Sequence, residues 1–281
     1  MIINGKFIRT LKWSYRRSTY FIRSLPDFII IGAMKCGTTS LYSYLASHPQ
    51  VLPASEKEVH YFDCDSYSLG MAWYKAHFPT LIRKYFQSKN RNNIIVGEAS
   101  PYYLFFPKAH IRVEECIPNI KLIIMLRNPI DRAFSHYNHQ KRKSREKLSF
   151  EQAIEVEFDR LDGEEKKILS EENYYSYNYW AYSYLARGRY VEQLERWFRL
   201  FPRINFHIIE SEEFFKNTPN ELNKVYDYLG IKYHILESYD KKNIGTYNKM
   251  HDATRKTLVD YFSAHNEKLF KLIDKRFNWD R

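Results

Sequence analysis

Cysteine is scarce in this sequence: the chain of 281 residues has only Cys36, Cys64 and Cys116. An odd number of cysteines without a Cys-x-x-Cys pair predicts neither a disulfide framework nor a zinc site, and it favours a reducing, cytoplasmic location. Long apolar runs are also missing. We therefore expect neither a signal peptide nor a membrane span, and we expect a soluble protein.

Internal repeats, low-complexity linkers and heptad runs are absent as well. The length suffices for one large α/β domain with a sizeable core. We predict a basic N-terminal extension over residues 1–26 and a single domain over residues 27–281.

Acidic residues are outnumbered: 44 Lys and Arg face 33 Asp and Glu, which gives a net charge of +11. This excess predicts an anionic partner, such as nucleic acid, anionic lipid, a polyanionic sugar or a highly phosphorylated cofactor. Residues 6–23 place six basic residues among aromatic and aliphatic ones. This segment is either a basic amphipathic helix on a membrane surface or an extension packed on the domain.

The stretch Asp27 to Leu45 presents the clearest local pattern. The apolar run 28–31 predicts a strand buried on both faces, as in a parallel sheet. Gly32 permits a sharp turn, Gly37 lets backbone approach a ligand, and three N-cap residue types then begin a helix (Thr38, Thr39 and Ser40). A strand, a turn and a helix N-terminus in this order predict a phosphate or sulfate site.

Lys35 distinguishes this turn from the P-loop of nucleotide kinases. In that motif the lysine follows the last glycine, whereas here it precedes Gly37 by two residues. The order therefore argues against a P-loop kinase.

A second anion-binding pattern follows the apolar run 121–126, which predicts another buried strand. Asn128 and Pro129 are typical of a helix start, so Arg127 falls at the carboxyl end of the strand, where open α/β sheets bind ligands. We expect Arg127 and the hydroxyl of Ser135 to converge on one phosphate.

Glu58 and His60 alternate with apolar neighbours in a segment that we expect to be extended. Both side chains would then face the same way, and either one could be the base, with the other as its partner. A plain ion pair on an edge strand explains the same pattern.

Further strands are predicted at 94–96 and 205–210, and a capping box begins a helix at Ser149. Residues 71–88 carry Trp73, His77, Leu81 and Tyr85 at four-residue spacing, which predicts one helix facing the core.

The segment 174–184 contains six tyrosines and one tryptophan, too many rings for one side of a regular element. Some rings must be exposed. We predict that Tyr175, Tyr177 and Tyr179 hold an acceptor substrate; the alternative is that they only pack the helices beside the cleft.

Several of these motifs together resemble the sulfotransferases that use 3′-phosphoadenosine 5′-phosphosulfate (PAPS), closest to heparan-sulfate and bacterial carbohydrate sulfotransferases. The resemblance covers about residues 27–279 and rests on KCGTT, EVHYFD, LRNPIDRAFSHY, GRYVEQLERWFRLFP, a GTY loop and the C-terminal helix. It implies a P-loop-like α/β fold, a central parallel sheet flanked by helices.

The resemblance also implies roles for individual residues. Glu58 would be the catalytic base and His60 a neighbouring active-site residue. Arg127 and Ser135 would hold the 3′-phosphate, and Lys35 would stabilise the transferred group. The remaining contacts to PAPS, or to the product 3′,5′-bisphosphoadenosine, would come from the phosphosulfate loop and a closing loop (Cys36, Gly37, Thr38, Thr39, Ser40, Gly245, Thr246 and Tyr247).

No metal is required by this chemistry, because a sulfuryl group carries less negative charge than a γ-phosphoryl group. The chain departs from the family pattern at Ala99, where the animal enzymes often have a lysine, and it lacks the disulfide that ties their cofactor loop. The acceptor is expected to be a carbohydrate or glycoconjugate hydroxyl or amine. A phenolic or lipid-linked acceptor remains open, as does a basic nucleic-acid-binding protein without enzymatic activity.

Overall fold

The computed structural model describes residues 5–91, 93–242, 245 and 249–279. Five parallel strands form its sheet in the order β2-β3-β1-β4-β5. Their bounds are β1 Phe28–Gly32, β2 Val51–Pro53, β3 Ile95–Ala99, β4 Lys121–Leu126 and β5 Phe206–Glu210. The predicted α/β fold with a central parallel sheet is confirmed.

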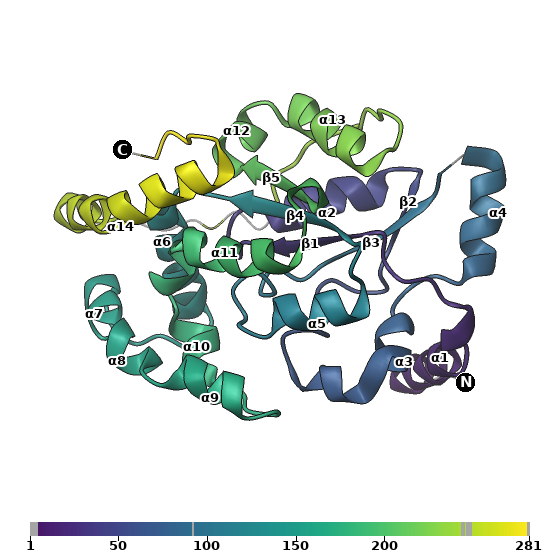
Figure 1. Cartoon of the computed structure of the whole chain (residues 1–281), viewed down its shortest axis with the longest axis horizontal. Coiled ribbons are helices and arrows are strands. Elements are labelled where there is room, and N and C mark those ends of the chain that lie inside the picture. The colour runs from purple at the N-terminus through teal and green to yellow at the C-terminus, as the bar shows by residue number, and fades with distance from the viewer. Residues whose placement is uncertain (1–4, 92, 243–244, 246–248, 280–281) are drawn as a thin grey trace.

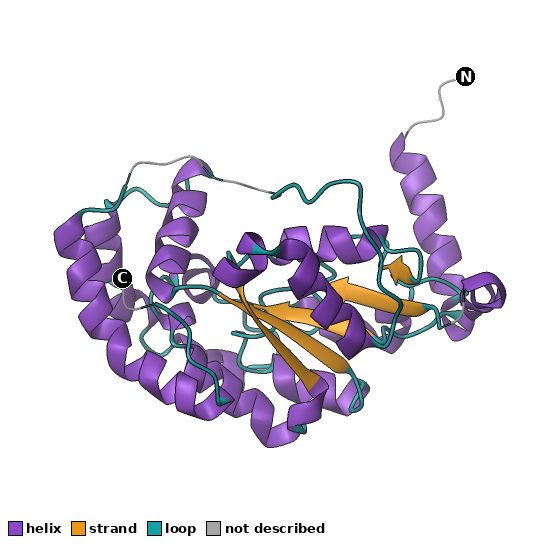
Figure 2. Ribbon diagram, turned by 90° about the horizontal axis from the view of Figure 1, so that it is seen from above, coloured by secondary structure: helices purple, strands orange, loops and turns teal. Residues whose placement is uncertain are grey.

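Helices cover both faces of the sheet (Figures 1 and 2). The helices α2 and α13 lie on one face, and α5 and α11 lie on the other. The longer ones are α1 Gly5–Ser18, α2 Thr38–Ser47, α4 Leu81–Arg91, α5 Ala109–Cys116, α6 Pro129–Arg142, α11 Tyr190–Leu200, α13 Thr218–Leu229 and α14 Asp252–Ile273. The shorter ones are α3 Gly70–Lys75, α7 Phe150–Glu155, α8 Glu157–Leu161, α9 Glu164–Ser170, α10 Tyr177–Tyr182 and α12 Ser211–Lys216, with 3-10 turns such as η1 Tyr20–Ile22.

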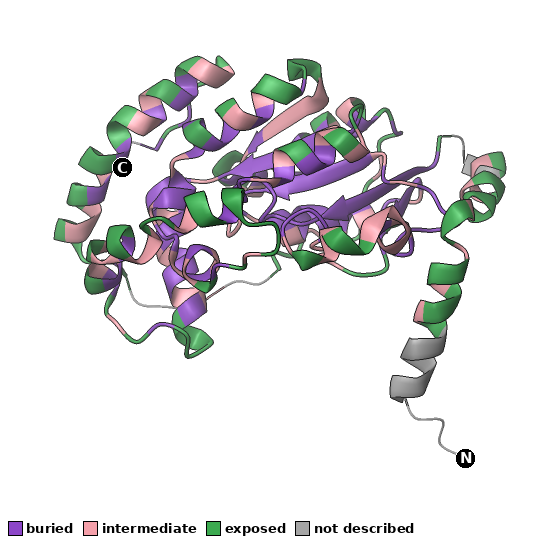
Figure 3. Ribbon diagram, turned by 60° about the horizontal axis from the view of Figure 1, so that its bottom comes forward, coloured by how far each residue is buried: buried purple, intermediate pink, exposed green. Residues whose placement is uncertain are grey.

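Burial on both faces explains the apolar composition of the central strands. All of β1 and β3 is buried, and Figure 3 shows the sheet as the buried centre of the molecule. Phe28 on β1 pairs in register with Gly97 on β3. A Cβ at Gly97 would lie 2.1 Å from the ring of Phe28, so the contact requires glycine there.

The predicted helix over 71–88 is wrong. The chain forms α3 and α4 instead, with Phe78 and Pro79 between them. Proline lacks the N–H that a helix needs and disfavours helical backbone at the residue before it. Trp73 still packs against the core, but Leu81 and Tyr85 are exposed.

The predicted helix start at Ser149 is confirmed. Ser149 accepts a hydrogen bond from the backbone N–H of Gln152 and completes the predicted capping box at the start of α7. Along α11 and its end, Tyr190, Leu194, Trp197 and Phe201 follow one another at helical spacing, and all four are buried.

Candidate active site

The turn between β1 and α2 contains the first anion-binding motif. Gly37 adopts the left-handed backbone (φ 95°), and a Cβ there would lie 2.6 Å from the ring of Phe215. No side chain caps α2. The backbone N–H groups of Ser40 and Leu41 donate to the carbonyl oxygen of Gly37. Those of Thr38 and Thr39 precede the first intrahelical bond and, with the helix dipole, favour an anion.

Lys35 lies in this turn within a group of positive charges. Burial lowers the pKa of Lys35, and the nearby guanidinium groups of Arg142, Arg127 and Arg132 lower it further. The Cys36 thiol opposes this shift. Several cationic side chains held together in a partly buried turn favour binding of an anion.

Arg132 is fully buried in α6 and adds to this charge. Its Nη2 donates to the carbonyl oxygen of Tyr184, whereas Nε and Nη1 have no partner among the described residues. Buried charged groups are normally paired. The sequence motif contained Arg132, but only its burial identifies it as part of the cationic cluster.

Arg127 and Ser135 lie where the second motif predicts them. Arg127 directly follows β4, and its Nη1 donates to the carbonyl oxygen of Lys35 at 3.4 Å. The hydroxyl of Tyr190 donates to the carbonyl oxygen of Arg127 at 2.9 Å and fixes this backbone. Ser135 is buried on α6, one turn after Arg132 and therefore on the same side of the helix.

Asp240 and Lys242, just before the predicted closing loop, contact α2 beside the same turn. The backbone N–H of Lys242 donates to Ser40 Oγ at 2.9 Å, and Tyr44 Oη donates to the carbonyl oxygen of Asp240 at 2.9 Å. These bonds hold the start of the predicted closing loop against α2. Gly245 is half-buried, and the predicted contacts Thr246 and Tyr247 lie outside the described residues.

The structure brings Glu58 and His60 together, although not through strand alternation. Their segment is an irregular loop in which His60 takes a left-handed backbone (φ 53°). His60 Nε2 lies 3.2 Å from Glu58 Oε2, and His60 Nδ1 lies 2.9 Å from Asp63 Oδ2. Lys57 Nζ donates to Glu58 Oε1 at 2.9 Å. The histidine is thus held between two carboxylates.

This arrangement distinguishes the two residues that the sequence left as alternative bases. Burial alone would raise the pKa of Glu58, but hydrogen bonds and charge from His60 and Lys57 lower it to about 2. Burial alone would lower the pKa of His60, but Asp63 and Glu58 raise it to about 11. At neutral pH His60 is an imidazolium without a free lone pair, so Glu58 is the group of the pair that can accept a proton.

Buried polar residues hold this loop in place. Ser100 Oγ accepts from the backbone N–H groups of Val59 at 3.1 Å and His60 at 3.3 Å, and it donates to Glu98 Oε2 at 3.3 Å. Burial raises the pKa of Glu98 to about 7, even with the hydrogen bond that Tyr74 donates to it.

Sequence reasoning gave no role to Asp63, Ser100 or Lys57. The spacing of Asp63, three residues after His60, is the one signal that could have found it. The position of the missing family lysine, Ala99, is buried, whereas Lys57 places an ammonium group at Glu58.

The tyrosine-rich segment divides between surface and core. Tyr175 and Tyr177 are 51% and 42% exposed, whereas Tyr179 is 3% exposed. Tyr179 stacks on Phe105 with ring centroids 4.5 Å apart and donates to Glu165. Tyr179 therefore packs the segment against the core, and its ring face is not available to an acceptor.

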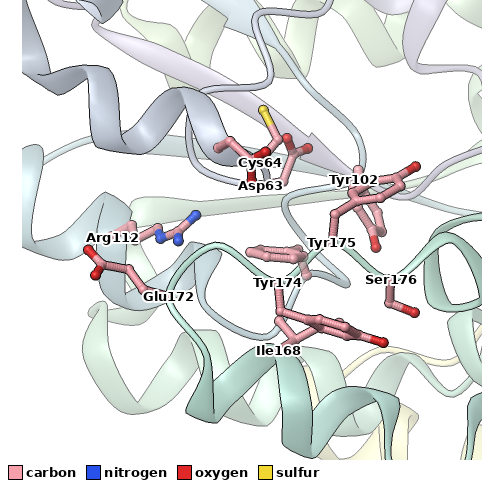
Figure 4. A pocket seen from close by; sticks show the side chains of 11 residues that line it. Asp63, Cys64, Tyr102, Arg112, Ile168, Glu172, Tyr174, Tyr175 and Ser176 are labelled. Carbon is pink, nitrogen blue, oxygen red and sulfur yellow. The ribbon is translucent and has the colours of Figure 1, made fainter.

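Tyr175 lines a pocket that reaches Asp63, the residue that contacts His60. Asp63, Cys64 and Tyr102 contribute to the same pocket, and Figure 4 shows these side chains and those of residues 174–176 around it. Residues more than a hundred positions apart in sequence thus meet beside the His60–Asp63 pair.

Arg187 connects this pocket with the phosphosulfate loop, and sequence reasoning missed it. It is buried, donates to Met34 Sδ at 3.0 Å and to the carbonyl oxygen of Trp180 at 2.6 Å, and lies over the Tyr102 ring. Burial lowers its pKa to about 10.

Within the described part of the chain, no group of three His, Cys, Asp or Glu side chains is arranged to hold a metal ion. The site thus combines a cationic turn, a carboxylate paired with an imidazolium, and a pocket lined by aromatic rings.

The model of the sulfotransferase domain family matches residues 25–271. The chain belongs to the sulfotransferase family. A crystal structure of a sulfotransferase from Alicyclobacillus acidocaldarius superposes with a TM-score of 0.69 at 30% identity, covering 92% of this chain and 100% of that one.

Characterised relatives share the domain in longer proteins. The membrane-associated sulfotransferase kil1 of Dictyostelium discoideum is 29% identical over 91% of this chain and 66% of its own length. The human bifunctional heparan sulfate N-deacetylase/N-sulfotransferase 3 is 28% identical over 89% of this chain and 30% of its length. The mouse heparan sulfate glucosamine 3-O-sulfotransferase 5 is 26% identical over 92% of this chain. The sulfotransferase domain therefore spans under a third of the N-deacetylase/N-sulfotransferase and about two thirds of the Dictyostelium protein.

Proposed function

We propose that this sulfotransferase moves the sulfuryl group of PAPS to a hydroxyl or amine of a carbohydrate or glycoconjugate. The observation that carries the proposal is the group of cations around Lys35 beside the N-terminus of α2, in which Arg132 Nε and Nη1 have no partner among the described residues. A donor with both a 5′-phosphosulfate and a 3′-phosphate matches that charge.

Each motif has a task in this reaction. Lys35 and the first amides of α2 bind the 5′-phosphosulfate, and Arg127 with Ser135 binds the 3′-phosphate. As the acceptor oxygen or nitrogen bonds to sulfur, the bond from sulfur to the bridging oxygen breaks, and its electron pair stays on 3′,5′-bisphosphoadenosine. Lys35 stabilises the charge that develops on that oxygen.

Glu58 takes the proton that the acceptor loses. The support for this role is its contact with His60, an imidazolium that cannot accept a proton itself. Acceptor binding has to displace the ammonium of Lys57 from Glu58, and Lys57 is then free to pair with an anionic acceptor.

Two observations support a carbohydrate as the acceptor: the relatives include heparan sulfate enzymes, and the rings of Tyr175 and Tyr177 are exposed. Flat amphipathic rings suit the faces of sugars. A phenolic or lipid-linked acceptor is the second candidate, because the pocket beside Asp63 is also lined by Tyr102 and Phe106.

The deciding experiment incubates the protein with labelled PAPS and a panel of glycans, glycolipids and phenols. We expect the wild-type protein to transfer the label to a glycan. In Lys35→Ala the turnover should fall by at least about a hundredfold. In Glu58→Gln the turnover should be almost lost, while binding of bisphosphoadenosine remains intact. Transfer to phenols alone would contradict the acceptor class.

A protein that binds nucleic acid without catalysis would behave differently. It would show no transfer, no preference for bisphosphoadenosine and an affinity for nucleic acid that falls steeply with salt. That set of results would overturn the proposed function.

Two further proposals concern where the enzyme works. We place it in the cytoplasm, with the basic N-terminal segment in contact with a membrane surface; the three thiols are free in the structure. Cell fractionation followed by a thiol-labelling assay tests the compartment.

A further inference from the structure

The helix α4 (Leu81–Arg91) has its apolar side turned to solvent. Leu81, Ile82, Tyr85 and Phe86 lie within one stripe at helical spacing and are 50%, 56%, 59% and 60% exposed. On the inner side Lys84 Nζ pairs with Asp27 at 2.7 Å. An amphipathic helix normally buries its apolar stripe, so this inverted orientation needs an explanation.

Exposed apolar rings from the N-terminal segment lie beside this helix. Arg23 forms a β-bridge with Thr80, directly before α4, and Arg23 Nη1 donates to the carbonyl oxygen of Phe78 at 2.6 Å. Phe21, two residues earlier, is 65% exposed, and Tyr20 is 43% exposed. Figures 1 and 3 show α1 and α4 at the same end of the molecule, where exposed residues predominate.

The charge of these two segments is of one sign. Residues 1–26 and 81–93 contain no Asp or Glu. They contain ten basic residues: Lys6, Arg9, Lys12, Arg16, Arg17, Arg23, Arg83, Lys84, Lys89 and Arg91. At α4 the Lys89 ammonium lies 5.0 Å from the centroid of the Tyr85 ring, so charge and apolar surface are interleaved.

We propose that α4 and the N-terminal segment form one docking face for an anionic lipid membrane. The stripe of Leu81, Ile82, Tyr85 and Phe86 enters the boundary between headgroups and acyl chains, and the surrounding Lys and Arg side chains bind anionic headgroups. No described helix is long and apolar enough to cross a membrane, so this contact is peripheral.

The charge of the docking face favours an anionic membrane, and not a second copy of this chain, as its occupant. Lys84 is paired with Asp27, and Arg23 is buried. Two copies joined through this face would still bring two groups of the other eight basic residues together, with no acidic residue in either segment. Nucleic acid would satisfy the charge, but it would leave Leu81, Ile82 and Phe86 in water.

The test measures co-sedimentation of the full chain with phosphatidylcholine vesicles, with and without about 30 mol% phosphatidylserine. We expect binding to the anionic vesicles that weakens with salt. Ile82→Ser/Phe86→Ser should weaken it at least about tenfold, because each large apolar side chain contributes roughly that factor when it leaves water. Arg83→Gln/Lys89→Gln should weaken vesicle binding about tenfold or more, because each basic residue near an anionic membrane strengthens binding roughly fivefold.

Matched controls come from the opposite end of the molecule, where α8 and α9 lie (Figure 1). Phe158 and Leu169 are 79% and 50% exposed, so Phe158→Ser/Leu169→Ser removes comparable apolar surface outside the docking face. Lys166→Gln on α9 together with Arg199→Gln on α11 removes the same net charge from two exposed positions outside the docking face. Both control pairs should bind vesicles like the wild type.

Three results would overturn the proposal: equal binding of the docking-face and control variants, binding to homopolymeric RNA but not to vesicles, or a dimer that Ile82→Ser/Phe86→Ser abolishes. An unchanged far-UV circular dichroism spectrum and an unchanged Tm in every variant show that the domain remains folded. Because vesicle binding needs no turnover, loss of the docking face and failure of the proposed reaction are separate outcomes.

Discussion

At the scale of single residues, the contact between His60 and Glu58 lowers the pKa of Glu58, the proposed base. The pKa of Glu58 is about 2 in the wild type, so kcat/KM should stay level as the pH falls from about 8 to about 5. In His60→Gln the carboxylate loses its imidazolium while its burial remains, so its pKa rises. The acid limb of the profile should then move up by more than about one pH unit.

The measurement is kcat/KM for the acceptor against pH, with PAPS saturating. His251→Gln, an exposed histidine outside the site, is the control and should leave the profile unchanged. An unaltered profile in His60→Gln would mean that Glu58 is not the titrating base.

Lys35 gives a second prediction at this scale. Burial and the guanidinium groups of Arg142, Arg127 and Arg132 lower the pKa of Lys35 in the free protein. Bound phosphates favour the charged ammonium and raise that pKa, so binding should take up a fraction of a proton at alkaline pH. Calorimetry of bisphosphoadenosine binding in two buffers of different ionisation enthalpy measures the uptake. Lys35→Met should abolish it; uptake that persists in this variant places the titrating group elsewhere.

At the scale of elements, the sheet depends on close contact between β1 and β3. Gly97→Ala would place a Cβ 2.1 Å from the Phe28 ring. We expect it to lower the free energy of unfolding by about 1–3 kcal/mol, the usual cost of overpacking. Gly163→Ala is the control: it has open space but a positive φ of 69°, so it should cost about 1–2 kcal/mol from backbone strain alone. Urea denaturation measures both losses, and a loss below about 1 kcal/mol in Gly97→Ala would contradict the steric argument.

The tyrosine-rich segment before and within α10 predicts a division of roles. Tyr175→Ala and Tyr177→Ala should raise the KM of the acceptor and leave cofactor affinity unchanged, because both rings are exposed. Tyr179→Ala should instead lower Tm, since removing a buried aromatic ring costs about 3–5 kcal/mol. If the first two variants lower only Tm, the rings pack the cleft and do not hold the acceptor.

At the scale of the whole molecule, binding of bisphosphoadenosine should stabilise the fold without metal. A ligand at about a hundred times its Kd adds about 2.7 kcal/mol to the free energy of unfolding. The rise in Tm should be equal in EDTA and in magnesium, because the motifs supply cationic side chains and backbone amides for both phosphates. A rise that requires magnesium would contradict metal-free binding.

The sequence by itself determined the parts that depend on neighbouring residues. Strand formation at 28–31, the glycine turn and the helix cap at Ser149 all follow from residues close in sequence. The tertiary structure therefore keeps these local preferences. The motif around Arg127 belongs to the same class, since a strand followed by Asn-Pro fixes where the arginine falls.

Tertiary structure alone decided which side chains meet and which face water. The cations around Lys35 come from residues about a hundred positions away, Tyr179 is buried while Tyr175 is exposed, and α4 turns its apolar stripe outward. Periodicity specifies a side of a helix but not what covers that side. Pairing across long sequence distances depends on how the elements pack, and no local pattern contains that information.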